Sequence, residues 1–473
     1  MEGKGGRPGE VRVKGERGCA TLRTSREHRP DPRSTPPLDP LPSAARNCPS
    51  IAEGSCHPRR HPAVPTAAPP PPRLHLVGPV PNPVPSPAVI KPSVAFNLRP
   101  TVAEIDLSAL ASNTRVAIRS ASGARLIAVV KADAYGHGAA TCAGTLLDAG
   151  AWGLAVSLVE EGVELRAAGV SAPILVLGGA APGSEDLVVA SGMRPVVWSQ
   201  EQIRRLAAAA RRAGTRCPIH LKIDTGMSRL GALLPELPAL AECFAREASD
   251  ALSLEGVMSH FACADSPDGE AESRRQLARF HEGLTTLRER GLEPVFSHIC
   301  NSAGLARFPE AHLGAVRAGI ALFGAASSPE VALDGLRPVM QLRSRLAAIR
   351  ELPAGASVSY GHRTTLERDT RAGVVPVGYE DGYQRRMSAS AHMLVRGRPC
   401  RILGNITMDL VLIDLNELEG EVADGERVVL LGRDGEREIS VFDWARWADV
   451  IPYEVMCGIS ARVPRRAVVP VTH

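Results

Sequence analysis

Lys131 is the side chain best suited to covalent chemistry in this sequence of 473 residues. It ends an apolar run, 125–130, which predicts a buried strand, and a glycine-containing stretch, 132–138, follows it. A lysine held at such a rim with a lowered pKa can form a Schiff base with an aldehyde. The chain has 50 arginines and five lysines, and only Lys131 and Lys222 lie outside the proline-rich leader. A strand-end lysine can also simply extend its amine into solvent, so composition alone leaves both interpretations open.

Other polar side chains also stand at or near the ends of apolar runs. Taken singly, each has an ordinary explanation: a histidine there can be a core residue, and an arginine can be a surface charge. Their placement becomes informative only if the fold brings these run ends together. The residues concerned are Lys222, Arg229, His260, Asn301, Ser302 and Arg317.

The segment after residue 98 alternates short apolar runs with helical segments. Asp106 stands as a predicted N-cap before an apolar stripe at helical spacing. Eight runs follow over about 225 residues, which matches a (β/α)8 barrel in number and length. A doubly wound sheet is the alternative, but the glycine-rich turn of a dinucleotide fold is missing after the first run. The predicted strands are 126–131, 152–157, 173–178, 194–199, 219–224, 254–260, 295–299 and 315–319, and the predicted helices include 159–168, 200–213, 235–247 and 271–290.

A barrel gives the polar run ends a common location, because its catalytic residues project from the carboxyl ends of the strands. Several ionisable or amide groups on one rim indicate a site. Near residue 336 the pattern changes to short β-type runs with glycine-containing turns, interrupted by one helical stretch, 440–448. We therefore expect an α/β chain with a barrel over 98–335 and a mostly β domain over 336–473. The predicted β runs are 343–349, 373–378, 394–403, 410–415, 427–431 and 462–469.

Charge and cysteine usage exclude several classes of function. Residues 1–97 carry a net charge of +7, which leaves −3 for the rest, since the whole chain carries +4. A slightly acidic folded part argues against a nucleic-acid surface. The ten cysteines are scattered without paired spacing, so we expect no metal cluster and free thiols suited to the cytoplasm. No apolar run reaches the length of a membrane span.

The leader, residues 1–97, is rich in proline and arginine. The first hundred residues hold 22 of the 39 prolines and show no hydrophobic periodicity, so we expect a disordered segment without catalytic residues. It lacks the apolar core of a secretory signal. It is either a true extension or a start assigned too far upstream, and we favour the second interpretation.

From residue 98 to the end, the sequence resembles the alanine racemases, a family of pyridoxal-phosphate enzymes with a barrel followed by a β domain. The matching motifs occur in order and at family-like spacing, and together they are highly specific. They lie at 129–138, 222–231, 301–303, 317–324, 358–361, 378–383, 408–409 and 452–454.

The resemblance implies a two-base racemisation of alanine. Lys131 would carry pyridoxal 5′-phosphate as a Schiff base and act as the base for D-alanine, while Tyr360 would act as the base for L-alanine. A phenol is a poor base at its reference pKa of about 10 and needs help from its neighbours. His260 matches the residue that hydrogen-bonds this tyrosine, and Arg317 matches the arginine that faces the pyridine nitrogen of the cofactor.

The resemblance also implies the remaining site residues. Arg229 matches the residue beside the cofactor and the substrate carboxylate. Lys222 matches a lysine that can be carbamylated and then holds this arginine. The five tyrosines all fall inside matched motifs. The residues that match the phosphate-binding set are Tyr135, Ser302, Gly319, Ile320 and Tyr453.

A homodimer is implied as well, because in the family the residues matching Tyr360 and Met408 enter the site from the partner subunit. Met408 would contact the substrate, and Tyr379 and Asp409 would line the entrance. Peptidoglycan supply is the usual role of the family's D-alanine. The sequence departs from the family pattern at positions that bear on substrate breadth rather than on chemistry: Ala318, Phe323, Glu380, Asn405 and Thr407.

Three alternatives stay open. The chain could racemise serine or a broader set of amino acids. It could be a barrel-type decarboxylase of basic amino acids, although that family pairs the pyridine nitrogen with a carboxylate, so Arg317 counts against it. It could be a non-catalytic protein that binds pyridoxal phosphate, although such proteins resemble the barrel alone.

Overall fold

The computed structural model describes residues 99–469, so the expectations for the leader lie outside the described residues. Eight parallel strands pair in the order β8-β7-β6-β5-β4-β3-β2-β9. All eight predicted runs are confirmed as these strands. Their bounds are β2 (Arg125–Val129), β3 (Gly153–Val156), β4 (Ile174–Val176), β5 (Arg194–Val197), β6 (Cys217–Lys222), β7 (Leu252–Met258), β8 (Phe296–His298) and β9 (Ala315–Ala318).

The barrel is nearly closed, and its seam lies between β8 and β9. β2 pairs with β9 in parallel, and two backbone hydrogen bonds join β9 to the region of β8. Arg317 N–H donates to the carbonyl of Cys300 at 3.1 Å, and Gly314 N–H donates to the carbonyl of Ser297 at 3.0 Å. The carboxyl ends of all eight strands therefore face one rim, as the sequence predicted.

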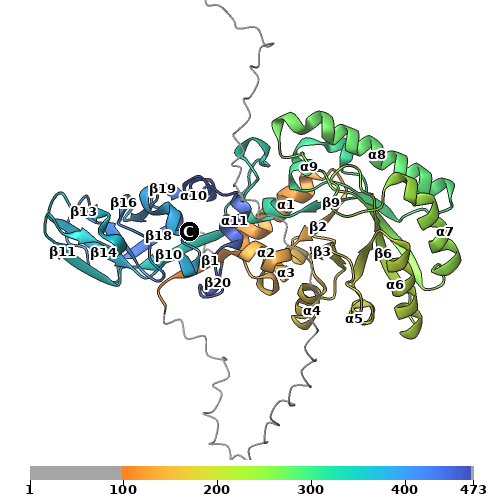
Figure 1. Ribbon diagram of the computed structural model, residues 1–473, viewed down its shortest axis with the longest axis horizontal. Coiled ribbons are helices and arrows are strands. Elements are labelled where there is room, and N and C mark those ends of the chain that lie inside the picture. Colours follow the sequence, from red (N-terminus) through yellow and green to blue (C-terminus); the bar gives the residue numbers. More distant parts are fainter. Residues whose placement is uncertain (1–98, 470–473) are drawn as a thin grey trace, which may run out of the picture. The chain divides into compact units, whose positions relative to one another are not determined.

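Helices lie outside the barrel strands, as Figure 1 shows. Asp106 is the N-cap predicted for α1, and its side chain accepts the N–H of Ala109 at 2.8 Å. Ser199 caps α6 in the same way. The helices of this part are α1 (Leu107–Ser120), α2 (Lys131–Gly136), α3 (Ala139–Asp148), α4 (Val159–Ala167), α5 (Glu185–Ala190), α6 (Gln200–Arg212), α7 (Leu237–Glu247), α8 (Glu270–Glu289) and α9 (Ser302–Arg307).

The second domain is built on a large sheet with the order β11-β14-β17-β16-β15-β18-β10-β1-β20, with β19 paired to β18 and a separate β12-β13 ribbon. Two helices, α10 (Val441–Ala448) and α11 (Pro452–Cys457), follow the strands. The sequence predicted a helical stretch over 440–448 but not α11, and the structure adds that Ser440 is the N-cap of α10. The strands are β10 (Met340–Arg345), β11 (Ala348–Leu352), β12 (Ser357–Val358), β13 (Thr364–Thr365), β14 (Thr370–Val375), β15 (His392–Val395), β16 (Arg398–Leu403), β17 (Val411–Asp414), β18 (Arg427–Asp434), β19 (Arg437–Ile439) and β20 (Arg465–Val468).

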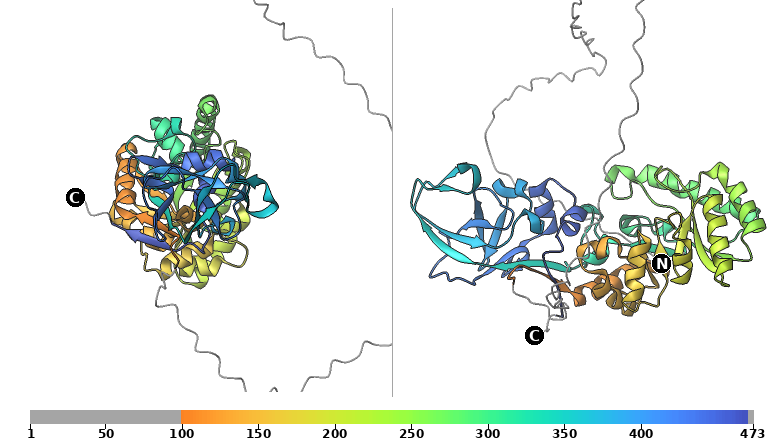
Figure 2. Two further views of the ribbon diagram at one scale, coloured as in Figure 1. Left: turned by 90° about the vertical axis from the view of Figure 1, so that its left-hand side faces the viewer. Right: turned by 60° about the horizontal axis from the view of Figure 1, so that its bottom comes forward.

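The first strand belongs to the sheet of the second domain, although the sequence-based boundary placed it in the barrel. β1 (Val102–Asp106) falls in the range assigned to the barrel, yet it pairs antiparallel with β10 and parallel with β20. In Figure 1 it lies, in orange, beside these strands of the second domain, and the right-hand view of Figure 2 shows the orange strand there as well. No local pattern reveals this pairing, because both partners are more than 230 residues away in the chain.

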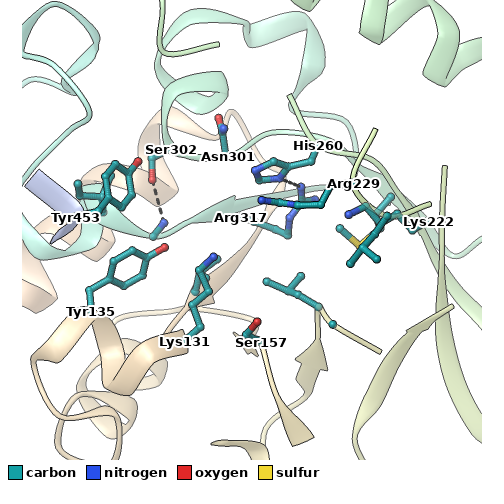
Figure 3. Close-up of a pocket in the computed structure, with 17 residues that line it drawn as sticks. Lys131, Tyr135, Ser157, Lys222, Arg229, His260, Asn301, Ser302, Arg317 and Tyr453 are labelled. Carbon is teal, nitrogen blue, oxygen red and sulfur yellow. Dashed lines mark hydrogen bonds between the residues drawn. The ribbon is translucent and has the colours of Figure 1, made fainter. Parts of the chain in front are cut away.

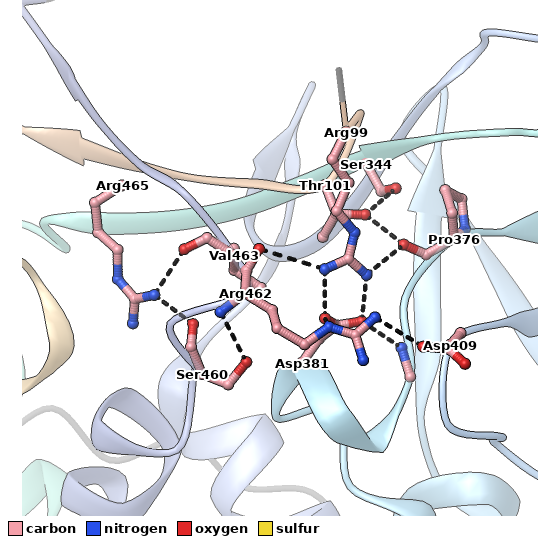
Figure 4. A network of polar contacts seen from close by, with 11 residues as sticks. Arg99, Thr101, Ser344, Pro376, Asp381, Asp409, Ser460, Arg462, Val463 and Arg465 are labelled. Carbon is pink, nitrogen blue, oxygen red and sulfur yellow. Dashed lines mark hydrogen bonds and ion pairs between the residues drawn. The ribbon is translucent and has the colours of Figure 1, made fainter. Parts of the chain in front are cut away.

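A buried carboxylate joins the two ends of the described chain (Figure 4). Asp381 is fully buried, and both of its oxygens accept hydrogen bonds from the guanidinium of Arg99 at 2.5 Å. Arg462 approaches the same carboxylate at 3.5 Å. Arg465, three residues later, donates to the carbonyl of Gly136 in α2 at 2.8 Å. The C-terminal segment is thus fixed both to its own domain and to the turn that carries Lys131. Within residues 99–469, no helix is both long and apolar enough to cross a membrane.

Candidate active site

A pocket of about 380 Å³ opens at the carboxyl ends of the barrel strands (Figure 3). It collects all the site residues predicted on the barrel, together with Tyr453 from α11. The lining residues are Val129, Lys131, Tyr135, Ser157, Leu177, Gly178, Lys222, Arg229, Leu230, Met258, His260, Asn301, Ser302, Arg317, Gly319, Ile320 and Tyr453.

The pocket is strongly positive. Four of its lining residues are cations, namely Lys131, Lys222, Arg229 and Arg317, and among the described residues that line it none is an aspartate or a glutamate. Within residues 99–469, no group of histidine, cysteine and carboxylate side chains is placed to hold a metal ion. Such a pocket suits an anionic ligand, because no carboxylate in the described lining neutralises the charges of these cations.

Lys131 and Tyr135 enter the pocket from one unusual turn. The four residues from Ala132 to Tyr135 have φ angles between 52° and 55°, so α2 is wound left-handed. In a helical turn of either hand, residues four positions apart lie on the same side, so both side chains face the pocket. Burial lowers the pKa of the Lys131 amine, and the charge of Arg229 lowers it further. A lowered pKa leaves more of the amine neutral, which is the nucleophilic form.

Ser302, Gly319 and the two tyrosines form a cradle of donors at one end of the pocket. Gly319 N–H donates to Ser302 Oγ at 2.9 Å. A Cβ atom on Gly319 would lie 2.3 Å from Tyr135 Oη, so only glycine allows this approach. Burial raises the pKa of both phenols, that of Tyr453 to about 12, so both stay protonated and can donate. The cradle presents the hydroxyl groups of Tyr135, Ser302 and Tyr453 beside the Gly319 backbone, and hydroxyl groups are donors that phosphate binds.

Arg317 lies buried in the wall of the pocket, next to His260 and His298. It donates to the carbonyl of Ser259 at 2.7 Å and approaches His260 Nδ1 at 3.1 Å (Figure 3). Burial lowers its own pKa to about 10, so it stays charged at neutral pH. Burial, followed by the charge of Arg317, lowers the pKa of His260 and of His298 well below the usual range. Both imidazoles are therefore neutral at this rim.

Lys222 and Arg229 enter from the two ends of the loop after β6. Asp224 organises this loop, because its Oδ1 accepts the N–H groups of Gly226, Met227 and Ser228 at 2.9, 3.0 and 3.1 Å. Burial lowers the pKa of Lys222 to about 8, with further lowering by Arg317 and Arg229. Asp224 lies in the matched motif 222–231, but these backbone contacts were not predictable from the motif.

Several lining residues were not predicted from the sequence. Ser157, Leu177, Gly178 and Met258 had no assigned role, although each lies at the carboxyl end of a predicted strand. That position on a barrel was the available signal.

The other four predicted site residues of the second domain, unlike Tyr453, do not line this pocket of the described chain. Tyr360 is 75% exposed, Met408 is 49% exposed and Tyr379 is 42% exposed. They are linked to one another through the segment 404–408. Tyr379 N–H donates to the carbonyl of Thr407 at 3.0 Å, and Asn405 Nδ2 donates to the carbonyl of Tyr360 at 2.7 Å. Asp409 forms an ion pair with Arg462 at 2.7 Å (Figure 4).

Comparisons with known proteins agree over the described chain. The family model "Alanine racemase, N-terminal domain" matches residues 105–327, and "Alanine racemase, C-terminal domain" matches residues 339–467. The alanine racemase of Symbiobacterium thermophilum is 44% identical over 369 residues, covering 78% of this chain and 97% of the relative. That of Geobacter sulfurreducens is 40% identical over 374 residues, with the same coverage of both chains.

Solved structures give the same result. The alanine racemase of Streptomyces lavendulae superimposes with a TM-score of 0.74 at 37% identity, covering 79% of this chain and 98% of the other. That of Bacillus anthracis, with bound L-Ala-P, has a TM-score of 0.73 at 34% identity, covering 78% and 95%. That of Bartonella henselae, described with covalently bound pyridoxal phosphate, has a TM-score of 0.70 at 26% identity, covering 78% and 99%.

Proposed function

The chain belongs to the alanine racemase family, and on that premise we propose that it interconverts L-alanine and D-alanine with pyridoxal 5′-phosphate as its cofactor. The observation that carries the proposal is the convergence of Lys131, Arg317 and the donor cradle in one pocket whose charged residues are all cations. A dianionic phosphate and a substrate carboxylate both fit that charge.

The residues present fit the cofactor. Lys131 would bind its aldehyde through the amine, and Arg317 would face its ring nitrogen. The cradle of Tyr135, Ser302, Gly319, Ile320 and Tyr453 would bind its phosphate. The close approach of Tyr135 Oη to Gly319, which leaves no room for a Cβ atom, supports this assignment. When bound, the cofactor supplies the electron sink that lets the α-proton of an amino acid leave.

Racemisation requires a proton transfer on each face of the α-carbon. Lys131 would remove or return the proton on the D-alanine face, and its lowered pKa suits both tasks. Tyr360 would serve the L-alanine face. His260 is neutral and can hydrogen-bond the phenol oxygen, and Arg229 would bind the substrate carboxylate.

Tyr360 would reach the pocket from a second copy of the chain. Its high exposure supports this, as does its absence from the lining of the pocket of the described chain. Met408 would approach with it and contact the substrate, while Tyr379 and Asp409 would line the entrance. The active enzyme would then be a homodimer with two composite sites.

Lys222 would carry a carbamate, formed when its neutral amine binds CO2 and releases a proton. The pKa of about 8 supports the presence of the neutral amine near neutral pH. The resulting anion would lie among Arg229 and Arg317, whose charges now act on Lys222. It would hold Arg229 in place for the substrate carboxylate.

In the cell, the product would serve peptidoglycan synthesis in the cytoplasm.

A racemase for serine or a broader set of amino acids is the second candidate. The observation that favours it is the altered entrance, where Asn405 and Thr407 depart from the family pattern and Asn405 binds the Tyr360 loop.

One experiment tests the proposal. The full chain is purified with added pyridoxal phosphate, and loss of optical rotation is followed with L-alanine, L-serine and L-lysine. We expect racemisation of L-alanine, a visible absorbance band near 420 nm (roughly, for a lysine-bound cofactor) and a borohydride-fixed cofactor on the Lys131 peptide. The absence of the band, or its persistence in Lys131→Ala, contradicts the proposal. Release of carbon dioxide without racemisation would favour a decarboxylase.

A further inference from the structure

The carboxylate of Glu161 joins two segments that enter the rim beside Lys131. Its Oε2 accepts the N–H groups of Ser157 and Leu158, at 2.7 and 3.0 Å, at the start of α4. Its Oε1 accepts the N–H of Ala132 at 2.6 Å. Ala132 directly follows Lys131, so one side chain fixes both the helix start and the backbone next to the amine-bearing residue.

The backbone that Glu161 holds is strained. Each residue from Ala132 to Tyr135 is in the left-handed region, which is unfavourable for a residue with a Cβ atom. The far end of this turn is held by His137, whose Nδ1 lies 3.0 Å from the carbonyls of both Ala134 and Tyr135. Glu161 supplies the partner at the near end. A strained turn keeps its shape only when contacts at both ends determine it.

We propose that Glu161 is a positioning residue for Lys131, which acts by binding the Ala132 amide and so fixing the left-handed turn that presents Lys131 and Tyr135 together. The consequence for racemisation rests on the proposed function. The charge of Glu161 has a second effect, because it raises the pKa of Lys131 while burial and Arg229 lower it. Cys457 of α11 is the further titratable group that raises it.

A plain helix cap is the competing explanation, and the chain contains a matched example. Glu236 occupies the same third position of a helical start, and its Oε2 accepts the N–H of Leu233 at 2.7 Å. It does not line the pocket of the described chain. Glu236→Gln therefore reports the effect of a weakened cap alone. Glu160→Gln, at the exposed neighbour of Glu161, reports the loss of one negative charge on α4.

The first measurement uses the full chain without cofactor. An amine-reactive reagent is applied across a pH series, and labelling of Lys131 is followed by mass spectrometry. Glu161→Gln should shift the midpoint of Lys131 labelling to lower pH, whereas Glu236→Gln and Glu160→Gln should leave it unchanged. The second measurement is racemisation by the loaded enzyme, where Glu161→Gln should lower kcat about tenfold or more in both directions through misplacement of the amine.

Glu161→Asp provides a second variant, since its shorter side chain keeps the charge but does not span both segments. It should lower kcat while shifting the labelling midpoint less than Glu161→Gln. If both Glu161 variants match Glu236→Gln in labelling and in kcat, Glu161 is only a cap and the inference fails. If the wild-type chain shows no racemisation but the labelling shift is present, the proposed function fails and the positioning of Lys131 stands.

Discussion

The guanidinium of Arg317 and the imidazole of His260 meet at 3.1 Å between Nη2 and Nδ1. Arginine has only donors, so His260 must accept at Nδ1 and carry its proton on Nε2. This contact therefore fixes the tautomer of His260 and leaves an N–H donor at Nε2. Such a donor is what a tyrosine oxygen needs if it is to hold negative charge, which links Arg317 to the proposed base Tyr360.

Replacing Arg317 should destabilise the barrel as well as alter the chemistry. Besides its contacts with the histidines, its guanidinium donates hydrogen bonds to the carbonyls of Ser259 and Ile299, at 2.7 and 3.0 Å. In Arg317→Glu a carboxylate would face these oxygens, and we expect a loss of roughly 3 kcal/mol or more in the free energy of unfolding. Urea denaturation measures it. The exposed Arg212→Glu, which breaks a surface pair with Asp186, is the control and should cost less than about 1 kcal/mol. An equal loss in both variants would contradict the buried role of Arg317.

Composite sites predict complementation between two inactive variants. Lys131→Ala and Tyr360→Phe should each be nearly inactive as homodimers. Random pairing gives heterodimers in half of the molecules, and one of their two sites combines an intact Lys131 with an intact Tyr360. Mixed subunits should therefore recover about a quarter of wild-type activity. The measurement is racemase activity after co-refolding or co-expression in equal amounts. Activity no higher than the sum of the separate variants would exclude a site shared between subunits.

Asn405 should control how well Tyr360 works. Its amide holds the Tyr360 carbonyl, and Ser359 Oγ donates back to the carbonyl of Asn405 at 2.8 Å. Ser359 has a φ of 63°, so this loop needs such contacts. Starting from D-alanine in deuterated water, Lys131 alone can exchange the α-proton, whereas inversion also needs Tyr360. Asn405→Ala should lower inversion about tenfold while exchange changes less than about twofold.

The control for this prediction is Asn416→Ala, since Asn416 also donates to a backbone carbonyl of the second domain, that of Asp369 at 3.0 Å. It should leave the ratio of exchange to inversion unchanged. A parallel loss of both rates in Asn405→Ala would remove the link to Tyr360.

Local patterns were sufficient to predict most of the fold. The eight barrel strands, the cap at Asp106 and the helix after Ser440 follow from apolar periodicity and capping residues, and the structure confirms them. The family resemblance and the barrel-plus-β fold are confirmed by the comparisons. The place of β1 was not predictable, because its partners β10 and β20 are remote in sequence. The left-handed winding of Ala132 to Tyr135 was equally hidden, since none of these residues is glycine.

The site residues fall into the same two groups, those that local patterns predict and those that depend on contacts remote in the sequence. Strand ends predicted the barrel residues, because their position follows from the topology, and the structure gathers them in one pocket. The contributions of Glu161 and Asp224 depend on which backbone N–H groups their carboxylates reach. Those contacts are set by loop conformation, which periodicity does not report. The roles proposed for Tyr360 and Met408 would require a second copy of the chain and stay predictions.

His137 should make stability fall in acid. Burial lowers its pKa from 6.5 to about 4, and its Nε2 is buried without a partner among the described residues. Between these two pH values the unfolded chain binds a proton that the folded chain does not bind. The free energy of unfolding therefore keeps the full contribution of His137 above pH 6.5 and loses it progressively as the pH falls toward 4. His137→Asn removes this titration. From pH 7 to pH 5 the wild type should lose roughly 2 kcal/mol more than the variant in urea denaturation. An identical loss in both proteins would contradict the assignment.

Lys222 should titrate and bind CO2 in the alkaline range. Its pKa is lowered from 10.5 to about 8, so between these values the unfolded chain holds a proton that the folded chain has released. Its contribution to stability therefore rises with pH across this window, and below pH 8 the burial penalty of the charged amine is present in full. A carbamate replaces that cation by an anion beside Arg229 and Arg317, so the penalty should disappear when CO2 is bound.

With 13C-labelled bicarbonate, the wild type should show a carbamate resonance that grows from pH 7 to pH 9. At pH 8 bicarbonate should also raise its free energy of unfolding, by up to roughly 3 kcal/mol. Lys222→Arg keeps the charge but cannot bind CO2, so it should show neither effect. A carbamate resonance that persists in Lys222→Arg would place the reaction at another amine.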